Sequence, residues 1–225
     1  MNRASWDLTR DAFKSPPSPD DDDEERVRRG PEVVPGMYII TMKFRGNEAR
    51  QSVHVLPDPR QEVTVADRLA KWNAILRAGQ LQESVTDAIM RIQKTRTDID
   101  AVTTKVKKSD ADSSKPDPIT ASAKALKQKL DAMERRLWNP PPSKGLEPPT
   151  AVMSYVGRAL LQALQSSFDA PTEAQMAWLA RAEAAYRAVL PDYNKLFAED
   201  VATFREAVRK QNVELLPEYK PVEWK

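Results

Sequence analysis

The most regular pattern in this chain is Gly30-Pro-Glu-Val-Val-Pro-Gly-Met-Tyr-Ile-Ile-Thr-Met-Lys-Phe44, followed by a second segment that ends in Leu56-Pro-Asp-Pro-Arg60. The Pro35-Gly36 pair supplies a turn, and the residues from Met37 to Phe44 are rich in side chains that favour strands. The pattern therefore predicts a β-strand that begins directly after a turn.

The residues after this strand predict a hairpin. Gly46 and Asn47 suit positive φ angles, so we expect the turn over residues 45–48 and the partner strand over Gln51–Leu56. Strand alternation places one set of side chains on the first face, namely Tyr38, Ile40, Met42 and Phe44. The opposite face receives Met37, Ile39, Thr41 and Lys43. In the partner strand, Val53 and Val55 alternate with Ser52 and His54.

Residues 1–60 contain too few predicted strands to form a closed β-domain. Ala4–Leu8 is one further strand candidate, and residues 15–29 form an acidic, proline-containing loop without regular structure. The side chains that we expect on the buried face are Trp6, Tyr38, Ile40 and Phe44. Because a hairpin and one strand cannot close a sandwich core, either further strands lie outside this chain or helices cover the open face.

From Thr64 onward the hydrophobic period becomes that of a helix. Thr64-Val-Ala-Asp67 predicts a start that is similar to a capping box, and Gly79 is a candidate for a bend. The apolar stripe of this long helix comprises Val65, Leu69, Trp72, Leu76, Val85, Ile89, Ile92, Ile99, Val102 and Val106. A polar loop is expected over 107–118.

Three further helical segments follow, and together they predict an up-and-down bundle of about four helices over residues 61–225. The first covers Ile119–Trp138 and ends at a Pro-rich loop over 139–149; the second covers Thr150–Phe168. The third opens with the capping box Thr172-Glu-Ala-Gln175, and Pro191 either kinks it or begins another helix.

Composition excludes several classes of function. The net charge of +2 gives no polyanion-binding surface by bulk charge, and the absence of cysteine removes thiolate chemistry and disulfides. No stretch reaches the length of apolar residues that a membrane helix needs, and the N-terminus does not read as a signal peptide. Catalytic triads, Gly-rich phosphate loops and metalloprotease motifs are also missing from the sequence.

Four features carry possible chemistry, and each has a more ordinary interpretation. His54 lacks a second ligand or an orienting acid in its strand, and the acidic run at residues 20–25 lacks the spacing of a Ca²⁺ loop. A basic region comprises Lys105, Lys107, Lys108, Lys124, Lys127 and Lys129, interleaved with aspartates. Aromatic side chains that can line a cleft or pack in a core are Trp72, Trp138, Tyr155, Trp178 and Tyr186. We therefore predict no catalytic, cofactor-binding or metal-binding residue.

Two segments carry a resemblance to known families. Trp6-Asp7-Leu8, Gly30-Pro31 and Pro35-Gly36-Met37-Tyr38 resemble the Ig-like, fibronectin-III-like domain of the FlgD type. The junction at residues 55–60 with the long helix is similar to the C-terminal region of bacterial sortilin-like β-propeller proteins, which contain BNR repeats and are often labelled glycosyl hydrolases. The resemblance implies an upstream propeller and an extracytoplasmic location, periplasmic or secreted. The acidic run departs from this pattern, because it is longer and more charged.

The sequence thus predicts a mainly α, α+β chain: a partial Ig-like β-segment over 1–60 and a helical bundle over 61–225. The predicted function is a non-catalytic accessory module for protein–protein or interdomain contacts, without cofactor or nucleic acid. Three alternatives stay open: a fragment or subunit of a secreted propeller hydrolase, a carbohydrate- or peptide-binding module, and an assembly component, a possible homo- or hetero-oligomer, that takes a strand from a neighbour.

Overall fold

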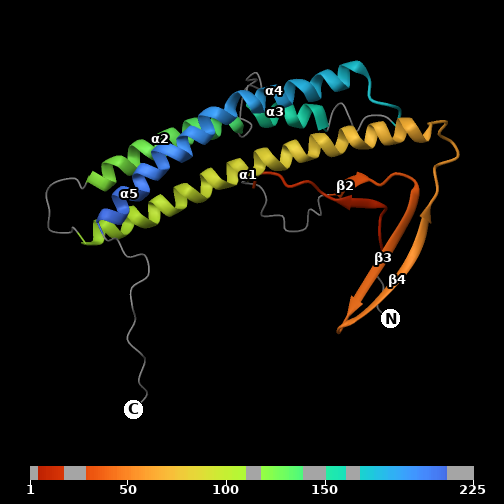
Figure 1. Cartoon of the computed structure of the whole chain (residues 1–225), viewed down its shortest axis with the longest axis horizontal. Coiled ribbons are helices and arrows are strands. Elements are labelled where there is room, and N and C mark those ends of the chain that lie inside the picture. Colours follow the sequence, from red (N-terminus) through yellow and green to blue (C-terminus); the bar gives the residue numbers. More distant parts are fainter. Residues whose placement is uncertain (1–4, 18–28, 110–117, 139–150, 161–167, 212–225) are drawn as a thin grey trace, which may run out of the picture. The chain divides into compact units, whose positions relative to one another are not determined.

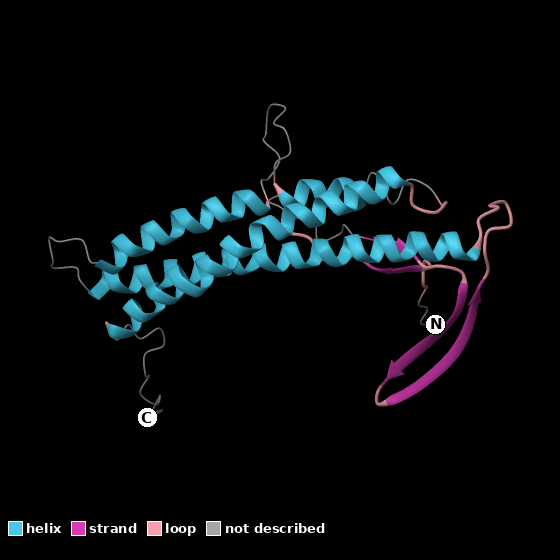
Figure 2. Cartoon of the chain, turned by 45° about the horizontal axis from the view of Figure 1, so that its top comes forward, coloured by secondary structure: helices cyan, strands magenta, loops and turns pink. Residues whose placement is uncertain are grey.

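A computed structural model describes residues 5–17, 29–109, 118–138, 151–160 and 168–211, and the following account concerns these residues. They form a mainly α, α+β structure with two small antiparallel sheets, as the sequence predicts (Figures 1 and 2). The strands are β1 (Thr9–Asp11), β2 (Arg29–Glu32), β3 (Gly36–Phe44) and β4 (Asn47–Val55). The helices are α1 (Val65–Ser109), α2 (Pro118–Leu137), α3 (Val152–Gly157), α4 (Glu173–Lys195), the π-helical turn η2 (Leu196–Val201) and α5 (Ala202–Lys210).

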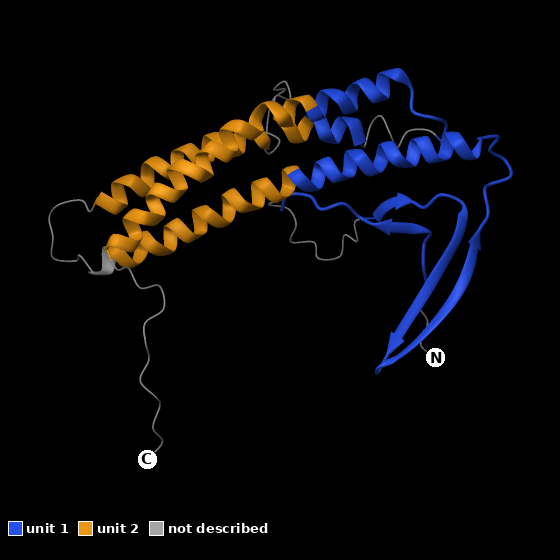
Figure 3. Ribbon diagram, in the orientation of Figure 1, with its two compact units in different colours: residues 1–84, 155–183 blue, residues 85–154, 184–225 orange. Residues whose placement is uncertain are grey.

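The chain divides into two compact units, coloured separately in Figure 3. Unit 1 comprises residues 1–84 and 155–183, and unit 2 comprises residues 85–154 and 184–225. The long helices α1 and α4 each contribute residues to both units. The units therefore do not follow the change from strands to helices at residue 60, and each is described by itself below.

The hairpin β3–β4 has the predicted partners and a tighter turn than predicted. Its register is continuous from Gly36↔Val55 to Phe44↔Asn47, which leaves only Arg45 and Gly46 in the turn. Both turn residues have positive φ, 46° and 83° respectively, as a two-residue type I′ turn requires. The assignment of positive φ to Asn47 was wrong, because Asn47 is the first residue of β4.

A second sheet, β1–β2, replaces the predicted strand at Ala4–Leu8. Leu8 has a φ of 61°, which breaks the extended conformation, so the strand starts at Thr9 and pairs with β2 around Thr9↔Glu32. Gly30 is required there, because a Cβ on this residue would lie 2.2 Å from the backbone oxygen of Arg10. The acidic loop predicted over 15–29 lies between these two paired strands, but its last residue, Arg29, belongs to β2; its residues 18–28 lie outside the described ranges.

Helix α1 starts as predicted and continues through Gly79. The Thr64 hydroxyl accepts a hydrogen bond from the Asp67 backbone N–H (3.1 Å) and donates to the Asp67 carboxylate (2.7 Å). The aspartate thus reaches the hydroxyl, whereas the longer Glu of a capping box reaches the backbone N–H. Gly79 makes room for a neighbour, because a Cβ at this position would lie 2.0 Å from two ring carbons of Phe13.

The predicted apolar stripe of α1 is confirmed for the residues in unit 2, but the prediction is wrong at the beginning of the helix. Its members from Val85 to Val106 are buried, whereas Val65 and Leu69 are exposed. The buried positions in the first turns of α1 are instead Lys71, Ala74, Ile75 and Ala78. The face that α1 turns toward the rest of unit 1 is therefore rotated from the one that the largest apolar side chains predict.

Unit 2 has a helical core that α2 illustrates most clearly. The buried side chains of α2 recur at helical spacing and are Ile119, Ala123, Leu126, Leu130, Met133 and Leu137. At the edge of this core, Arg96 of α1 binds both Asp131 and Glu134 of α2 at 2.6 Å. Gln93 donates a further hydrogen bond of 2.8 Å to Glu134. Ion pairs of this kind fix which faces of the helices meet.

The segments after α2 correct the end of the helix predicted over Thr150–Phe168, of which residues 161–167 lie outside the described ranges, and exclude one of the two alternatives for Pro191. Helix α3 ends at Gly157 and passes into a π-helical turn over 158–160, and Phe168 is not helical but lies in a bend with 54% exposure. Helix α4 continues through Pro191 to Lys195, so the proline begins no new helix. The change of helical geometry comes later, in η2, before α5 begins. Such π-helical turns are one of the usual sites where a helix changes direction.

The capping box at the start of α4 is confirmed and gives a testable contribution to stability. The Thr172 N–H donates to the Gln175 side chain (3.0 Å), and the Gln175 N–H donates to the Thr172 hydroxyl (3.3 Å). We expect Thr172→Ala to lower the free energy of unfolding by about 1 kcal/mol, because the N-cap bond is lost. Urea denaturation followed by circular dichroism measures this change.

The matched control is Thr97→Ala, which removes an exposed hydroxyl from the interior of α1, where it donates to the Gln93 backbone carbonyl. Because alanine is the better helix former, this control should leave stability unchanged or raise it slightly. Equal losses in the two variants would contradict a capping role for Thr172.

Candidate functional site

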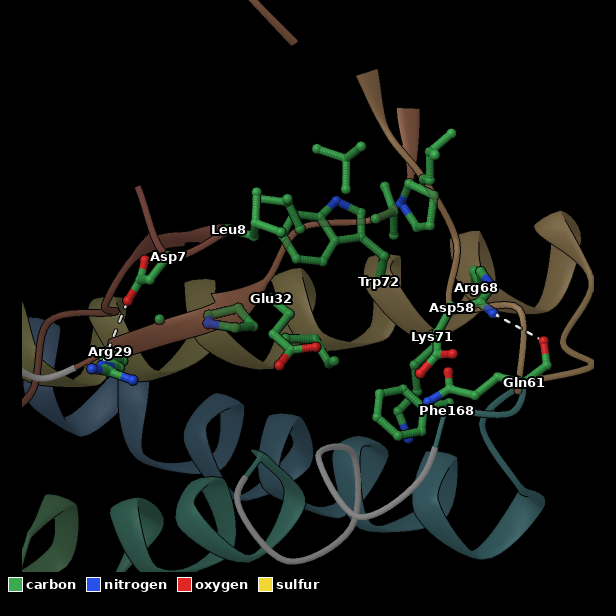
Figure 4. A pocket seen from close by; sticks show the side chains of 18 of the residues that line it. Asp7, Leu8, Arg29, Glu32, Asp58, Gln61, Arg68, Lys71, Trp72 and Phe168 are labelled. Atoms are coloured by element: carbon green, nitrogen blue, oxygen red, sulfur yellow. Dashed lines mark hydrogen bonds and ion pairs between the residues drawn. The ribbon is translucent and has the colours of Figure 1, made fainter. Parts of the chain in front are cut away.

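Unit 1 contains a pocket of about 730 Å³ between the β1–β2 sheet, the β4–α1 connection and the first turns of α1 (Figure 4). Its strand side is formed by residues around Leu8 and by 29–35, its connection side by residues 55–61, and its helix side by residues 68–75. Phe168 completes the lining. The pocket exists because β1 and β2 pair next to α1, which no local sequence pattern indicates.

The helix side of the pocket carries two cations. Lys71 is only 6% exposed, and burial lowers its pKa, although the negative charge of Asp169 acts in the opposite direction. Arg68 donates long hydrogen bonds of 3.4 Å to the backbone oxygens of Gln61 and Val63. These contacts tie α1 to the segment that precedes it.

The connection side is ordered by the Asp58-Pro-Arg60 sequence. The Arg60 side chain donates to Asp58 through Nε (3.0 Å) and Nη2 (2.8 Å), and the Arg60 backbone N–H donates to the same carboxylate (3.0 Å). These hydrogen bonds lower the pKa of Asp58. Asp58 therefore stabilises the turn between β4 and α1, and its carboxylate is already occupied.

The strand side contains a third group of interactions. Arg29 and Asp7 form an ion pair of 3.5 Å, seen at one end of the pocket in Figure 4. Next to it, the Trp6 and Tyr38 rings meet edge-on at 5.4 Å, and the Tyr38 hydroxyl donates to the Val34 backbone oxygen (2.6 Å). These contacts hold the base of the hairpin on the β1–β2 segment.

The pocket brings cations and carboxylates together. Arg29 and Arg60 each bind an aspartate, and the lining contains neither histidine nor a hydroxyl nucleophile. Within the described ranges, no three His, Asp or Glu side chains lie together in an arrangement that could hold a metal ion.

The outer part of the hairpin presents a different kind of site, an exposed apolar surface. Five large side chains of β3 are exposed to solvent: Met37 (67%), Ile39 (70%), Ile40 (42%), Met42 (64%) and Phe44 (62%). The expectation that Trp6, Ile40 and Phe44 are buried was wrong, because all three side chains are exposed, Trp6 by 37%. The fourth expected residue, Tyr38, is half-buried. Among the described residues of the hairpin, those at its base are covered best, and Val55 is buried there.

The remaining sequence candidates are spread over both units. His54 is exposed on β4 opposite Met37. In the basic region, Lys127 pairs with Asp100 and Lys129 with Asp200, so these cations are engaged by acidic neighbours of unit 2. Among the predicted aromatic residues, Trp72 lines the pocket of unit 1, whereas Trp138 and Tyr186 belong to unit 2.

Sequence reasoning missed the two arginines of a cluster in unit 1, which is formed by α3, the π-helical turn after it and α4. The Arg158 and Arg181 guanidinium groups lie over the Trp178 ring at 4.9 and 5.5 Å from its centroid, and Arg181 also lies 5.2 Å from that of Tyr155. The spacing of three residues between Tyr155 and Arg158, and between Trp178 and Arg181, is the signal that could have found it. The cluster joins the two helices.

Comparisons of the chain with protein-family models, with curated proteins and with solved structures give no match. Among the helices of the described residues, none combines the length and the apolar character that crossing a membrane demands.

Proposed function

We propose that this chain is a non-catalytic accessory module that mediates protein–protein or interdomain contacts through its β3–β4 hairpin. The observation that carries the proposal is the row of five exposed apolar side chains on β3. Exposed apolar patches of this kind are rare on monomers and are typical of interaction sites. A two-stranded hairpin is also marginal by itself in water, so a partner that covers it stabilises both its structure and the contact.

The sequence resemblance supplies a context for this proposal. In sortilin-like propeller proteins a helical C-terminal region follows an Ig-like segment, and the natural partner of the hairpin would be a β-structured domain upstream of it or a separate subunit. Extracytoplasmic location belongs to the same proposal. The pocket supports a structural role for the rest of unit 1, because its charged side chains join β2 to the segment before β1, order the β4–α1 connection and tie that connection to α1.

A photo-crosslinking experiment tests the proposal with a matched pair of methionines. Met42 lies on the hairpin and is 64% exposed, and Met90 lies on α1 and is 48% exposed. We expect a photoreactive amino acid at position 42 of the full chain to form a discrete crosslinked product in the cells that produce the protein. The same residue at position 90 should give none. Crosslinks of equal yield at both positions, or none at position 42, would contradict a contact role for the hairpin.

A further inference from the structure

The two strands of the hairpin differ in a way that the apolar surface alone does not explain. All five exposed large hydrophobic side chains lie on β3, and they occupy both of its faces. Met37 and Ile39 lie on one face, and Ile40, Met42 and Phe44 lie on the other. Strand β4 exposes mainly polar side chains in the same region, among them Glu48, Arg50, Ser52 and His54.

This asymmetry is the one that distinguishes an inner strand from an edge strand. Inner strands are apolar on both faces because both are covered, whereas edge strands carry charges that discourage pairing with other chains. Strand β4 has the charged composition of an edge strand, and the salt bridge between Arg50 and Glu48 (2.6 Å) keeps two of its charges at the surface. Strand β3 has the composition of an inner strand, yet no strand other than β4 pairs with it among the described residues.

We propose that a β-strand from a partner pairs along the free edge of β3, so that the order in the completed sheet is partner strand, β3, β4. This inference rests on the proposed contact function and specifies its geometry. The partner strand belongs to a β-domain with further layers, because only such a domain also covers the apolar side chains that protrude from the two faces of β3. A second copy of this chain is disfavoured for that reason: it would extend the sheet and leave the same side chains exposed on both copies.

The charges at the hairpin tip narrow the chemistry of the partner. Lys43, Arg45 and Arg50 outnumber Glu48 in this region, and the Arg45 guanidinium lies 5.2 Å from the centroid of the Phe44 ring. A partner with apolar side chains beside Met37–Met42 and carboxylates beside the tip complements this arrangement.

The turn fixes which backbone groups are available for the partner. In a two-residue turn the flanking pair Phe44↔Asn47 is hydrogen-bonded, and bonded and non-bonded pairs then alternate along the ladder. The pair Ile39↔Ser52 is therefore a non-bonded pair, whose two amides point away from each other. The amides of Met37, Ile39 and Thr41 face the free edge of β3, and those of Arg50, Ser52 and His54 face the free edge of β4.

Amide hydrogen exchange of the crosslinked complex tests this geometry without a substitution at any of the amides that are compared. The full chain is crosslinked in the producing cells through position 42, purified with whatever it has bound, and compared with the free chain. We expect exchange at Met37, Ile39 and Thr41 to slow by about tenfold or more, since these amides gain hydrogen bonds, and exchange at Arg50, Ser52 and His54 to change less than about twofold. Protection of the β4 amides alone, or of neither edge, would overturn the inference.

A pair of proline substitutions provides the second test. Ile39→Pro and Ser52→Pro each remove one outward amide at the same level of the hairpin, and proline is tolerated where a strand amide faces solvent. We expect Ile39→Pro to reduce the amount of retained partner by about tenfold or more and Ser52→Pro to reduce it less than about twofold. The hydrogen-exchange comparison decides the matter if Ile39→Pro disturbs the hairpin itself.

The outcomes separate this inference from the proposed function. If a partner is retained and only Ser52→Pro releases it, the hairpin is a contact surface but the β3 edge is the wrong one. If exchange slows on β3 only at high concentration of the purified chain, the occupant is a second copy and the assignment of a layered β-domain is wrong. If wild-type protein retains no partner and shows no protection on either strand, the proposed function and the inference fall together.

Discussion

Replacing Gly79 by alanine is expected to lower the free energy of unfolding by about 1–3 kcal/mol, the usual cost of forcing an extra methyl group into a packed site. The Cβ would lie 2.0 Å from two carbons of the Phe13 ring, which is itself only 7% exposed. The ring must therefore leave its site on α1, and the segment before the acidic run loses the contact between Phe13 and Gly79. Urea denaturation of the full chain, followed by circular dichroism, measures the loss.

A second background tests the cause of this effect. In a Phe13→Ala protein, which lacks the ring, the same Gly79→Ala change should raise stability by about 1 kcal/mol, because alanine favours a helix over glycine. The substitution thus changes sign between the two backgrounds, which a general disturbance of α1 does not produce. A loss of similar size in both backgrounds would show that Gly79 is needed for a reason other than contact with Phe13.

Leu130→Ala is the other substitution with a large expected effect, a loss of about 3 kcal/mol or more. The Leu130 side chain is fully buried in the middle of α2, so its removal leaves a cavity in the core of unit 2. Denaturation gives the total change, and hydrogen exchange in α2 should accelerate because the local opening becomes easier.

Gln128→Ala is the matched control for this prediction, since Gln128 is exposed on the same helix. It should leave stability within about 0.5 kcal/mol of wild type, because it neither opens a cavity nor removes a cap. If Leu130→Ala lowers the free energy of unfolding no more than Gln128→Ala does, the packing of α2 against the other helices of unit 2 is not what stabilises that unit.

The elements predicted best from the sequence are those with a local and repeated signal. In α2 the buried positions recur at helical spacing, and in β3 the alternation and the following Gly46 define a hairpin without reference to the rest of the chain. The fold class follows from these periods. The register of the hairpin was not predicted, because the turn was expected over the four residues 45–48, whereas only Arg45 and Gly46 lie between the paired strands.

The features that escaped prediction depend on contacts between distant residues. The β1–β2 sheet pairs residues on the two sides of the acidic loop, and Gly79 accommodates the ring of Phe13. The local sequence at these positions does not indicate either contact. Lys71 is buried on α1 although its side chain is charged, which a hydrophobic pattern assigns to the surface. The pocket is built from such pairings, so the sequence could not indicate it. The apolar side chains of β3 were visible in the sequence as an alternating pattern, but their exposure was not predicted.

The composition of β3 has a consequence for the isolated protein in solution. The six residues from Met37 to Met42 contain no charge and no proline and favour strands, which is the composition of segments that stack into amyloid-like fibrils. Lys43 and Arg45 follow directly and act as gatekeepers against such stacking. We therefore expect Lys43→Thr to shorten the lag time of fibril formation, measured by thioflavin T fluorescence, and the shelf life of purified material to depend on these two cations.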